Sequence, residues 1–99
     1  MAYHIVWTDI AKEDIRAVIE YLKLRWSATT AEKFIDNFYT QITLISNQPF
    51  IGIASDKYKN VRRILITKHN ALFYRVENST ITLLSLFDTR QNPDKNPYD

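Results

Sequence analysis

Two amphipathic helices, separated by a short break, constrain the fold of this chain more than any other feature of its sequence. In the first, apolar residues recur at helical spacing after a capping residue at Thr8 or Asp9, and the helix is expected to run to about Arg25. Its apolar face comprises Ile15, Val18, Ile19, Leu22 and Trp26. Because tryptophan is large and amphipathic, Trp7 and Trp26 are both expected to pack in the core or between helix and sheet.

The second helix is predicted to begin at a capping box, in which Thr29 and Glu32 have the S/T-x-x-E spacing, and to end before Pro49. Its apolar stripe comprises Ala31, Phe34, Ile35, Phe38, Ile42 and Ile45. A short turn between two such helices makes them antiparallel neighbours. Because this helical hairpin cannot bury both stripes internally, the two helices require a sheet to pack against.

The remaining segments supply that sheet. Tyr3–Thr8 is predicted to form a short first strand, because it is rich in β-branched and aromatic residues. After a loop over 48–59, further strands are predicted at 61–67, 71–77 and 81–87, with the segments T-K-H-N and N-S-T as hairpin turns. The order β-α-α-β-β-β predicts an α+β fold, in which the N-terminal helical hairpin packs on one face of a small, mainly antiparallel sheet.

Length and composition predict a single domain, 1–99, with a polar tail at 88–99. Hydrophobic residues make up 45% of the chain, which argues against global disorder. There is no cysteine, and the two histidines do not belong to a metal motif, so neither a metal nor a cofactor is expected. No signal peptide or membrane-spanning apolar run is recognised, and a cytoplasmic protein is therefore expected.

Basic residues are concentrated in one stretch of the chain. Residues 57–75 hold six Lys and Arg and no acid, whereas residues 1–47 hold five Lys and Arg against six acids. A local field of one sign attracts an anionic partner, either nucleic acid or an acidic protein segment. The alternative is that these side chains line a solvated sheet edge, where lysine discourages aggregation.

Four sequence phrases span nearly the whole chain in a characteristic order. They are V-W-T-D-I-A-K-E-D-I, N-Q-P-F-I-G, V-R-R-I-L-I-T-K-H-N-A-L-F-Y-R-V and L-S-L-F-D-T-R-Q-N-P. Together with the order of the predicted elements, they resemble the RelE/ParE superfamily of toxins from type II toxin–antitoxin systems. The resemblance implies a toxin that is neutralised by a cognate antitoxin, whose extended or helical segment wraps it and covers its sheet or helix faces.

The superfamily holds two activities, and this chain resembles its ParE-like members more than its RelE-like members. RelE-like toxins cut mRNA in the ribosomal A site, whereas ParE-like toxins inhibit DNA gyrase without being nucleases. In the phrase that matches N-A-L-F-Y, RelE-like toxins usually carry an arginine where this chain has Ala71. Alanine can neither pair with a phosphate nor stabilise charge, so the resemblance argues against an intact ribonuclease site.

Three residues nevertheless match positions of the RelE-like catalytic site. Arg90 falls where a second catalytic arginine sits, and Lys57 and Lys59 lie near the position of a basic pair. The expected C-terminal tyrosine is displaced to Tyr98, eight residues beyond Arg90. If the chain is an enzyme, the resemblance implies a metal-independent mRNA endonuclease. The structural alternative is that Asp88 and Arg90 brace a turn through hydrogen bonds and an ion pair.

Arg62, Arg63, Lys68 and Arg75 are the candidates for binding a nucleic acid or another target. Strand alternation places Arg63 and Arg75 together on the sheet face opposite the helices. Arg62 shares the parity of the helix-facing residues, which suits an arginine only at the edge of the strand. Alternatively, these arginines are solvated charges or ion-pair partners of nearby carboxylates.

Three functions stay open at this point. The first is a toxin that inhibits growth by binding an essential target, with DNA gyrase suggested by the resemblance alone. The second is a ribosome-dependent mRNA endonuclease, in which residues 57–75 grip rRNA phosphates. The third is a non-toxic interaction module of the same fold. The partners implied are an antitoxin and either gyrase or the ribosome with its mRNA, and a homodimer and a heterotetramer with the antitoxin are both left open.

Overall fold

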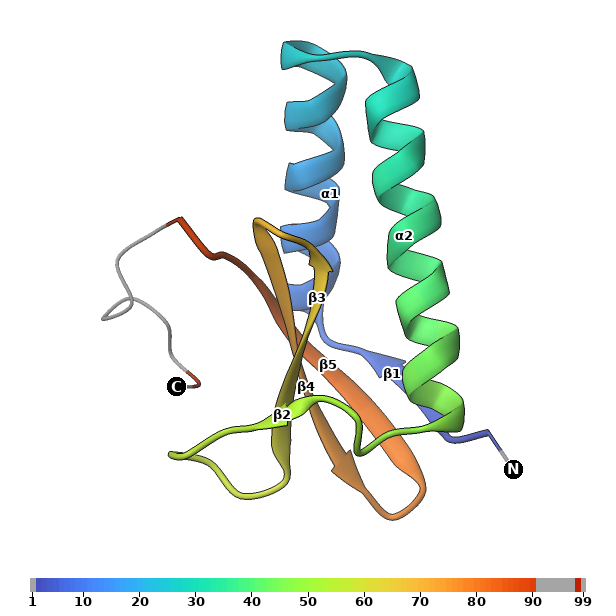
Figure 1. The fold of residues 1–99 in the computed structure, drawn as a ribbon, viewed down its shortest axis with the longest axis vertical. Helices are drawn as coiled ribbons and strands as arrows, with labels where there is room; N and C mark the ends of the chain where they lie inside the picture. Colours follow the sequence, from blue (N-terminus) through green and yellow to red (C-terminus); the bar gives the residue numbers. More distant parts are fainter. Residues whose placement is uncertain (1, 91–97, 99) are drawn as a thin grey trace.

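The computed structural model describes residues 2–90 and 98, which form a helical hairpin and a five-stranded sheet. The elements are β1 (His4–Trp7), α1 (Asp9–Arg25), α2 (Ala28–Asn47), β2 (Ile53–Ala54), β3 (Val61–Thr67), β4 (Asn70–Glu77) and β5 (Thr80–Asp88) (Figure 1). The strand order is β1-β5-β4-β3-β2, with β1 parallel to β5 and the other pairs antiparallel. The predicted α+β fold is confirmed, and the two-residue β2 is an addition within the segment predicted as a loop.

Helix α1 is attached to β5 through two side chains. The Thr8 hydroxyl caps the helix by accepting a hydrogen bond from the backbone N–H of Ala11 at 3.1 Å, and it donates to the carbonyl oxygen of Leu83 at 2.7 Å. Nearly two turns further along, the Asp14 carboxylate accepts a hydrogen bond from the backbone N–H of Leu86 at 3.0 Å. Because both contacts reach the same strand, they fix the orientation of α1 on the sheet.

Helix α2 begins two residues earlier than the capping box predicts. The N-cap is Ser27, whose backbone is extended and whose Oγ accepts a hydrogen bond from the backbone N–H of Thr30 at 3.1 Å. Ser27 therefore supplies the capping oxygen before Thr29 is reached, and the prediction of a box at Thr29 and Glu32 is wrong. The predicted stripe is confirmed, since its buried members are Ala31, Phe34, Phe38, Ile42 and Ile45.

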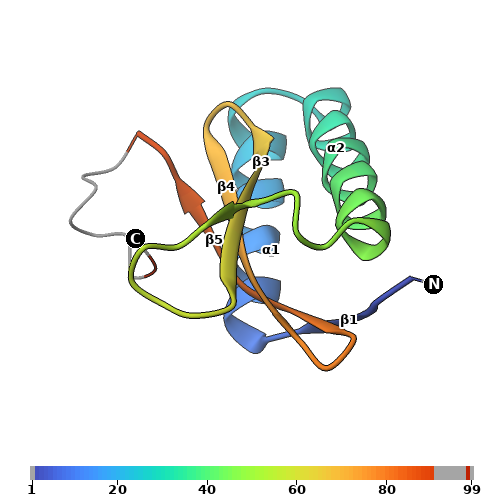
Figure 2. The same ribbon diagram turned by 60° about the horizontal axis from the view of Figure 1, so that its bottom comes forward.

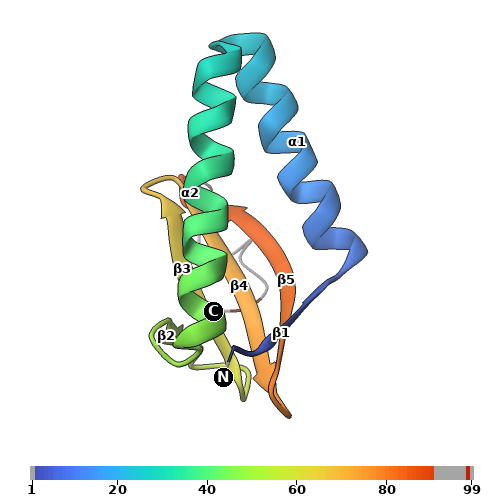
Figure 3. The ribbon, with the colours of Figure 1, turned by 90° about the vertical axis from the view of Figure 1, so that its right-hand side faces the viewer.

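The main core lies between the helices and one face of the sheet. The sheet contributes Ile66, Leu72, Tyr74, Val76, Ile81 and Leu83. Trp7 packs at the edge of this core with its ring 5.4 Å from that of Phe38, as predicted. Trp26 is 70% exposed, so the prediction that it is buried is wrong. It caps the C-terminal end of α1, and the turn between α1 and α2 projects beyond the end of the sheet (Figures 1 and 3).

A second, smaller core lies on the other face of the sheet. Its buried members are Val61, Ala71, Phe73 and Leu84, and the partly buried Phe87 and Tyr98 pack against it. Figure 2 shows α2 to one side of the sheet, while the loop between β2 and β3 reaches to the other side. We call this second surface the open face. Tyr98 belongs to the polar tail predicted at 88–99, yet it contributes to a core.

Both predicted hairpin turns are present. Asn78 and Ser79 join β4 to β5 with φ values of 51° and 62°, which is the left-handed pair that a type I′ turn requires. In the turn from β3 to β4, the Thr67 hydroxyl accepts hydrogen bonds from the backbone N–H of His69 at 3.2 Å and from the side-chain amide of Asn70 at 2.8 Å. These local bonds hold the turn that borders the helices.

The Tyr74 hydroxyl ties the sheet to the loop that follows α2. It donates a hydrogen bond to the carbonyl oxygen of Pro49 at 2.9 Å and accepts one from the backbone N–H of Gly52 at 3.1 Å. Burial raises the pKa of Tyr74 above its ordinary value, so the hydroxyl remains a donor. A Cβ atom on Gly52 would collide with this hydroxyl and lie 2.8 Å from the carbonyl oxygen of Arg63. Glycine is therefore required where the loop enters β2.

We expect the substitution Tyr74→Phe to lower the free energy of unfolding by about 1–3 kcal/mol, because it leaves the Pro49 carbonyl and the Gly52 N–H without their partner in a buried site. Urea unfolding followed by circular dichroism measures this change. The control is Tyr39→Phe on α2, where the side chain is 56% exposed, and its effect should stay within about 0.5 kcal/mol. Equal effects of the two substitutions would contradict the anchoring role.

Candidate functional site

The residues that match the RelE-like catalytic positions are divided between the two ends of β3. Lys57 and Lys59 lie in the loop that precedes β3, and both are exposed. Arg90 lies beside the turn that follows β3, because the backbone N–H of Thr89 donates to the carbonyl oxygen of His69 at 2.9 Å. The structure therefore does not bring Arg90 together with the two lysines.

Arg90 is paired with Asp88 in a bidentate arrangement. Its Nε lies 3.1 Å from Oδ1 and its Nη2 lies 2.9 Å from Oδ2, while its backbone N–H also donates to Oδ1 at 2.9 Å. The side-chain hydrogen bond from Arg90 holds the pKa of Asp88 below its ordinary value, and the same bond raises the pKa of Arg90. The pair braces the end of β5, as the structural alternative for these two residues predicts.

Ala71 lies on the open face, next to the turn between β3 and β4, and is only 3% exposed. It pairs with Leu65 on β3 and with Phe87 on β5, and Phe73 follows it on the same face. The position where RelE-like toxins usually carry an arginine is thus a packed apolar site in this chain. To supply the positive charge that RelE-like toxins have at this position, an arginine of the neighbouring strand would have to extend over Ala71.

Tyr98 lies at the other end of the open face, against aromatic neighbours. Its ring centroid is 5.3 Å from that of Phe73 and 5.9 Å from that of Tyr58. The Ser55 hydroxyl donates a hydrogen bond to the Tyr98 carbonyl oxygen and accepts bonds from the backbone N–H groups of the loop after β2. Tyr98 therefore sits beside the loop that carries Lys57 and Lys59. Sequence reasoning missed this contact, because no local pattern links a terminal residue to Phe73.

Arg63 and Arg75 share the open face, as strand alternation predicts. The register pairs Arg63 with Phe73 and Arg75 with Val61, so both arginines border the second core. The Nε of Arg75 lies 3.6 Å from a carboxylate oxygen of Glu77. Together with the two lysines of the preceding loop, these arginines give the open face a basic border around an apolar centre.

Arg62 points to the helix side near the start of β3, where it pairs with Ala54 of the edge strand β2. A position near the end of the strand is the one that its parity requires. Its guanidinium donates hydrogen bonds to the carbonyl oxygens of Phe50 at 3.1 Å and Gly52 at 2.8 Å. The same group lies 5.3 Å from the centre of the Phe50 ring. Arg62 therefore holds the loop between α2 and β2. Lys68 is exposed in the turn at the far end of β3.

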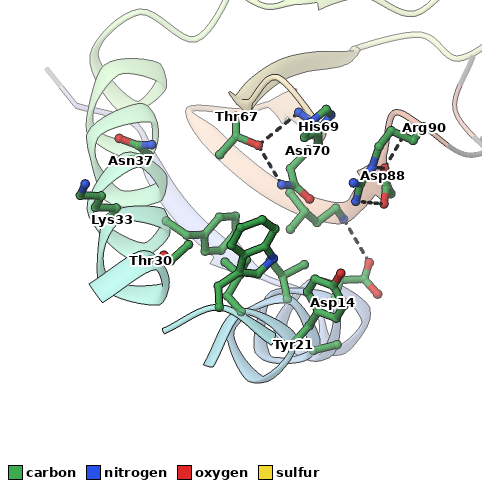
Figure 4. A pocket seen from close by; sticks show the side chains of 16 residues that line it. Asp14, Tyr21, Thr30, Lys33, Asn37, Thr67, His69, Asn70, Asp88 and Arg90 are labelled. Carbon is green, nitrogen blue, oxygen red and sulfur yellow. Dashed lines mark hydrogen bonds and ion pairs between the residues drawn. The ribbon is translucent and has the colours of Figure 1, made fainter. Parts of the chain in front are cut away.

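A groove of about 780 Å³ opens between the helical hairpin and the turn that joins β3 to β4 (Figure 4). Its apolar wall comprises Val18, Leu22, Trp26, Phe34 and Leu86. Its polar rim includes Lys33 and Asn37 on α2, and His69 and Arg90 at the end of the sheet. Sequence reasoning missed this groove because it assigned Trp26 to the core. The signal available was the position of Trp26 at the end of the helical pattern.

These two surfaces suit different partners. An apolar groove with a mixed polar rim is typical of sites that bind an amphipathic protein segment. A basic border around aromatic side chains suits an anionic partner. Within residues 2–90 and 98, no cluster of three or more His, Asp or Glu is placed to hold a metal ion. In the same part of the chain, no helix has both the length and the hydropathy needed to cross a membrane.

The sequence and the fold both have known relatives. Residues 5–93 match the family described as the ParE toxin of the type II toxin–antitoxin system parDE. A chain of the chromosomal ParDE toxin–antitoxin system from P. aeruginosa has a TM-score of 0.73 and 17% identity, and the similarity covers 88% of this chain and 96% of that chain. No curated protein is significantly similar in sequence.

Two further structures come from Staphylococcus aureus. The YoeB dimer has a TM-score of 0.63 at 13% identity, over 92% of this chain and 100% of that chain. The heterotetrameric YoeB–YefM toxin–antitoxin complex has a TM-score of 0.58 at 15% identity, again over 92% of this chain and 100% of that chain. At these identities the likeness to solved structures shows the shared fold, whereas the family match rests on the sequence itself.

We expect the carboxyl group of Asp88 to titrate below the ordinary value of about 3.9, because hydrogen bonds from Arg90 favour the charged form. Carbon-13 NMR measures this titration. The substitution Arg90→Gln should raise the midpoint toward 3.9, whereas Arg16→Gln on α1 should leave it unchanged. Since the pKa is lowered in the folded state, the stability that the pair adds is present above about pH 4 and is lost as the pH falls through the folded pKa. A midpoint insensitive to Arg90→Gln would contradict the pairing.

Proposed function

We propose that this chain, which belongs to the ParE toxin family of type II toxin–antitoxin systems, inhibits growth by binding an essential target rather than by cleaving RNA. The observation that carries this proposal is the distribution of the cations. Arg90 is paired with Asp88 at one end of β3, the two loop lysines lie at the other end, and Ala71 occupies the position of the missing arginine in a packed apolar site. Transition-state stabilisation in RNA cleavage requires cations that converge on one phosphate.

The target that we propose is DNA gyrase, on the strength of the family resemblance. Such a target lies in the cytoplasm, where we place the protein. Its recognition by the open face is supported by Arg63 and Arg75, which border the apolar centre formed by Val61 and Phe73. Contact through this face would explain why residues 57–75 hold six Lys and Arg and no acid. Lys57 and Lys59, in the loop before β3, extend the same surface, and we propose Lys68, in the turn after β3, as a further contact.

We propose that the groove beside the helical hairpin receives a segment of the antitoxin. Trp26 is 70% exposed at its mouth and belongs to a contiguous apolar wall, which is typical of an interaction site. The wall formed by Leu22 and Phe34 suits the apolar face of an amphipathic helix, with anchors spaced at i, i+3 or i+4, and i+7. The solved ParDE and YoeB–YefM systems are themselves toxin–antitoxin systems, which supports a partner of this kind.

One observation favours the alternative of an mRNA endonuclease. Tyr98 packs on Tyr58, in the loop that carries Lys57 and Lys59. A tyrosine hydroxyl with adjacent ammonium groups is a plausible proton donor or acceptor in ribonuclease chemistry. This arrangement lacks Arg90, and the alternative therefore depends on whether the Tyr98 hydroxyl is required for growth inhibition.

The first test is parallel labelling of new protein and new DNA within minutes of inducing the chain in a bacterial host. We expect DNA synthesis to fall first while translation continues, because a gyrase-type target blocks replication directly. An immediate fall in protein synthesis, with DNA synthesis following later, would overturn the binding proposal. No change in either rate, with the protein folded and abundant, would favour the non-toxic interaction module.

A second test separates target binding from RNA cleavage by removing one oxygen atom, that of the Tyr98 hydroxyl. The substitution Tyr98→Phe keeps the ring on Phe73 but removes the hydroxyl, so we expect growth inhibition to persist. The open-face double substitution Arg63→Ala and Arg75→Ala should instead weaken inhibition at least about tenfold in inducer dose, if each arginine contributes about 0.7 kcal/mol or more to target binding. The matched control is Arg16→Ala with Lys23→Ala on α1. Loss of inhibition in Tyr98→Phe, with circular dichroism unchanged, would favour the endonuclease.

A further inference from the structure

Two aliphatic side chains stay exposed where the open face meets the β2 edge of the sheet. Ile53 on β2 is 62% exposed, and Leu65 on β3 is 51% exposed. Ile53 pairs with Arg63, and Leu65 follows Arg63 by two residues on the same strand, so both side chains point to the open face. Diagonal neighbours of this kind lie about 7–8 Å apart. We call Ile53 and Leu65 the edge strip.

The apolar centre of the open face is much less accessible than the edge strip. Val61 and Phe73 are each 1% exposed. The Tyr98 ring lies 5.3 Å from the Phe73 ring, and the Tyr58 ring lies 5.9 Å from the Tyr98 ring, so the aromatic side chains here already pack on one another. A partner that docks on this face without rearranging it therefore contacts aliphatic side chains at the edge strip.

The composition of this edge differs from that of a protected sheet edge. Edge strands are commonly shielded by lysine, by proline or by other charged side chains, because an exposed apolar edge favours association. Here β2 presents Ile53, and Leu65 lies next to it. The Leu65 carbonyl oxygen already accepts a hydrogen bond from the Gln41 side chain at 2.8 Å. The edge strip therefore offers a partner its side chains more than its backbone.

The charges around the edge strip indicate what kind of partner fits it. Lys57 and Lys59 are exposed in the loop before β3, and residues 57–75 hold six Lys and Arg and no acid. An acidic surface is complementary to this border. Faces that bind single-stranded nucleic acid combine such cations with aromatic rings on which bases stack, whereas protein interfaces combine an apolar centre with a polar rim. Isoleucine and leucine next to a basic border match the protein interface.

We propose, building on the target-binding role proposed above for the open face, that this face docks on an acidic protein surface and that Ile53 and Leu65 determine its specificity. Apolar side chains of the target bury the edge strip, while its carboxylates face the basic border. A nucleic acid would contact the cations and leave Ile53 and Leu65 in water. The two aliphatic side chains therefore distinguish a protein partner from a nucleic acid.

The test compares two double variants of the full-length chain that remove exposed aliphatic side chains. Ile53→Thr with Leu65→Thr clears the edge strip and keeps β-branched residues, which suit strands. Ile10→Gln with Leu24→Gln is the matched control on α1, where the isoleucine is 62% exposed and the leucine 82% exposed. Glutamine is a good helix former. If circular dichroism shows that the edge double variant is unfolded, Leu65→Thr alone replaces it.

Binding to purified DNA gyrase is measured by biolayer interferometry, and binding to a labelled RNA of about 20 nucleotides by fluorescence anisotropy. We expect the edge variant to bind gyrase at least about tenfold more weakly than the unsubstituted chain, and the control to stay within about twofold. Its affinity for the RNA should not change, because every cation is retained. Equal binding of gyrase by the edge variant and the unsubstituted chain would overturn the role of the edge strip and leave gyrase as the target.

Growth inhibition in a bacterial host tests the edge strip without assuming that the target is gyrase. If the unsubstituted chain does not bind gyrase, yet the edge variant inhibits growth at least about tenfold more weakly in inducer dose, the edge strip stands and the gyrase target falls. Undiminished inhibition by the edge variant, with tight RNA binding, would assign the open face to a nucleic acid and overturn the protein partner.

Two further outcomes would also overturn this role of the edge strip. Sedimentation velocity could show self-association of the unsubstituted chain that the edge variant lacks, and Ile53 and Leu65 would then be covered by a second copy. An unsubstituted chain that neither binds gyrase nor inhibits growth would overturn both the edge strip and the target-binding role of the open face.

Discussion

The attachment of α1 to β5 is the constraint on which the rest of this structure depends. Thr8 and Asp14 each reach a backbone group of the same strand, and β5 lies between β1 and β4 in the sheet. Fixing α1 there also fixes α2, because the break between the helices is short. The groove then follows from this geometry: Leu86, whose N–H binds Asp14, forms part of its apolar wall. A single polar contact thus links the orientation of the helices to the surface proposed for the antitoxin.

The parts of the fold that could be predicted are those specified by periodicity within a segment. The stripe of α2, the turn at Asn78 and Ser79, and the placement of Arg63 and Arg75 on the open face all follow from spacing alone. Alternation also placed Arg62 on the helix side near the end of its strand, although its bonds to loop carbonyls could not be predicted. In each of these cases, the position of the residue depends on local contacts or follows from the alternation of side chains along a strand.

The features that escaped prediction depend on contacts between distant segments. Trp26 continues the apolar spacing of α1, but the helix extends past the end of the sheet, so the side chain stays 70% exposed. Tyr98 lies in a polar segment, yet its ring packs on Phe73. The placement of Arg90 away from Lys57 and Lys59 likewise depends on the length of β3. The resemblance to family phrases therefore pointed to Arg90, Lys57 and Lys59 as candidates. It did not indicate whether these three side chains lie together in the fold.

The pairing of β1 with β5 has a consequence for how the chain acquires its structure. His4 pairs with Thr80, so β1 gains a neighbouring strand only when β5, the last strand, is in place. The entropy of closing so long a loop must be overcome before that contact stabilises anything, and folds dominated by such pairings form slowly. During synthesis on the ribosome, the helical hairpin emerges well before the sheet that covers it. A partner that binds the hairpin could therefore engage the chain before its strands have assembled.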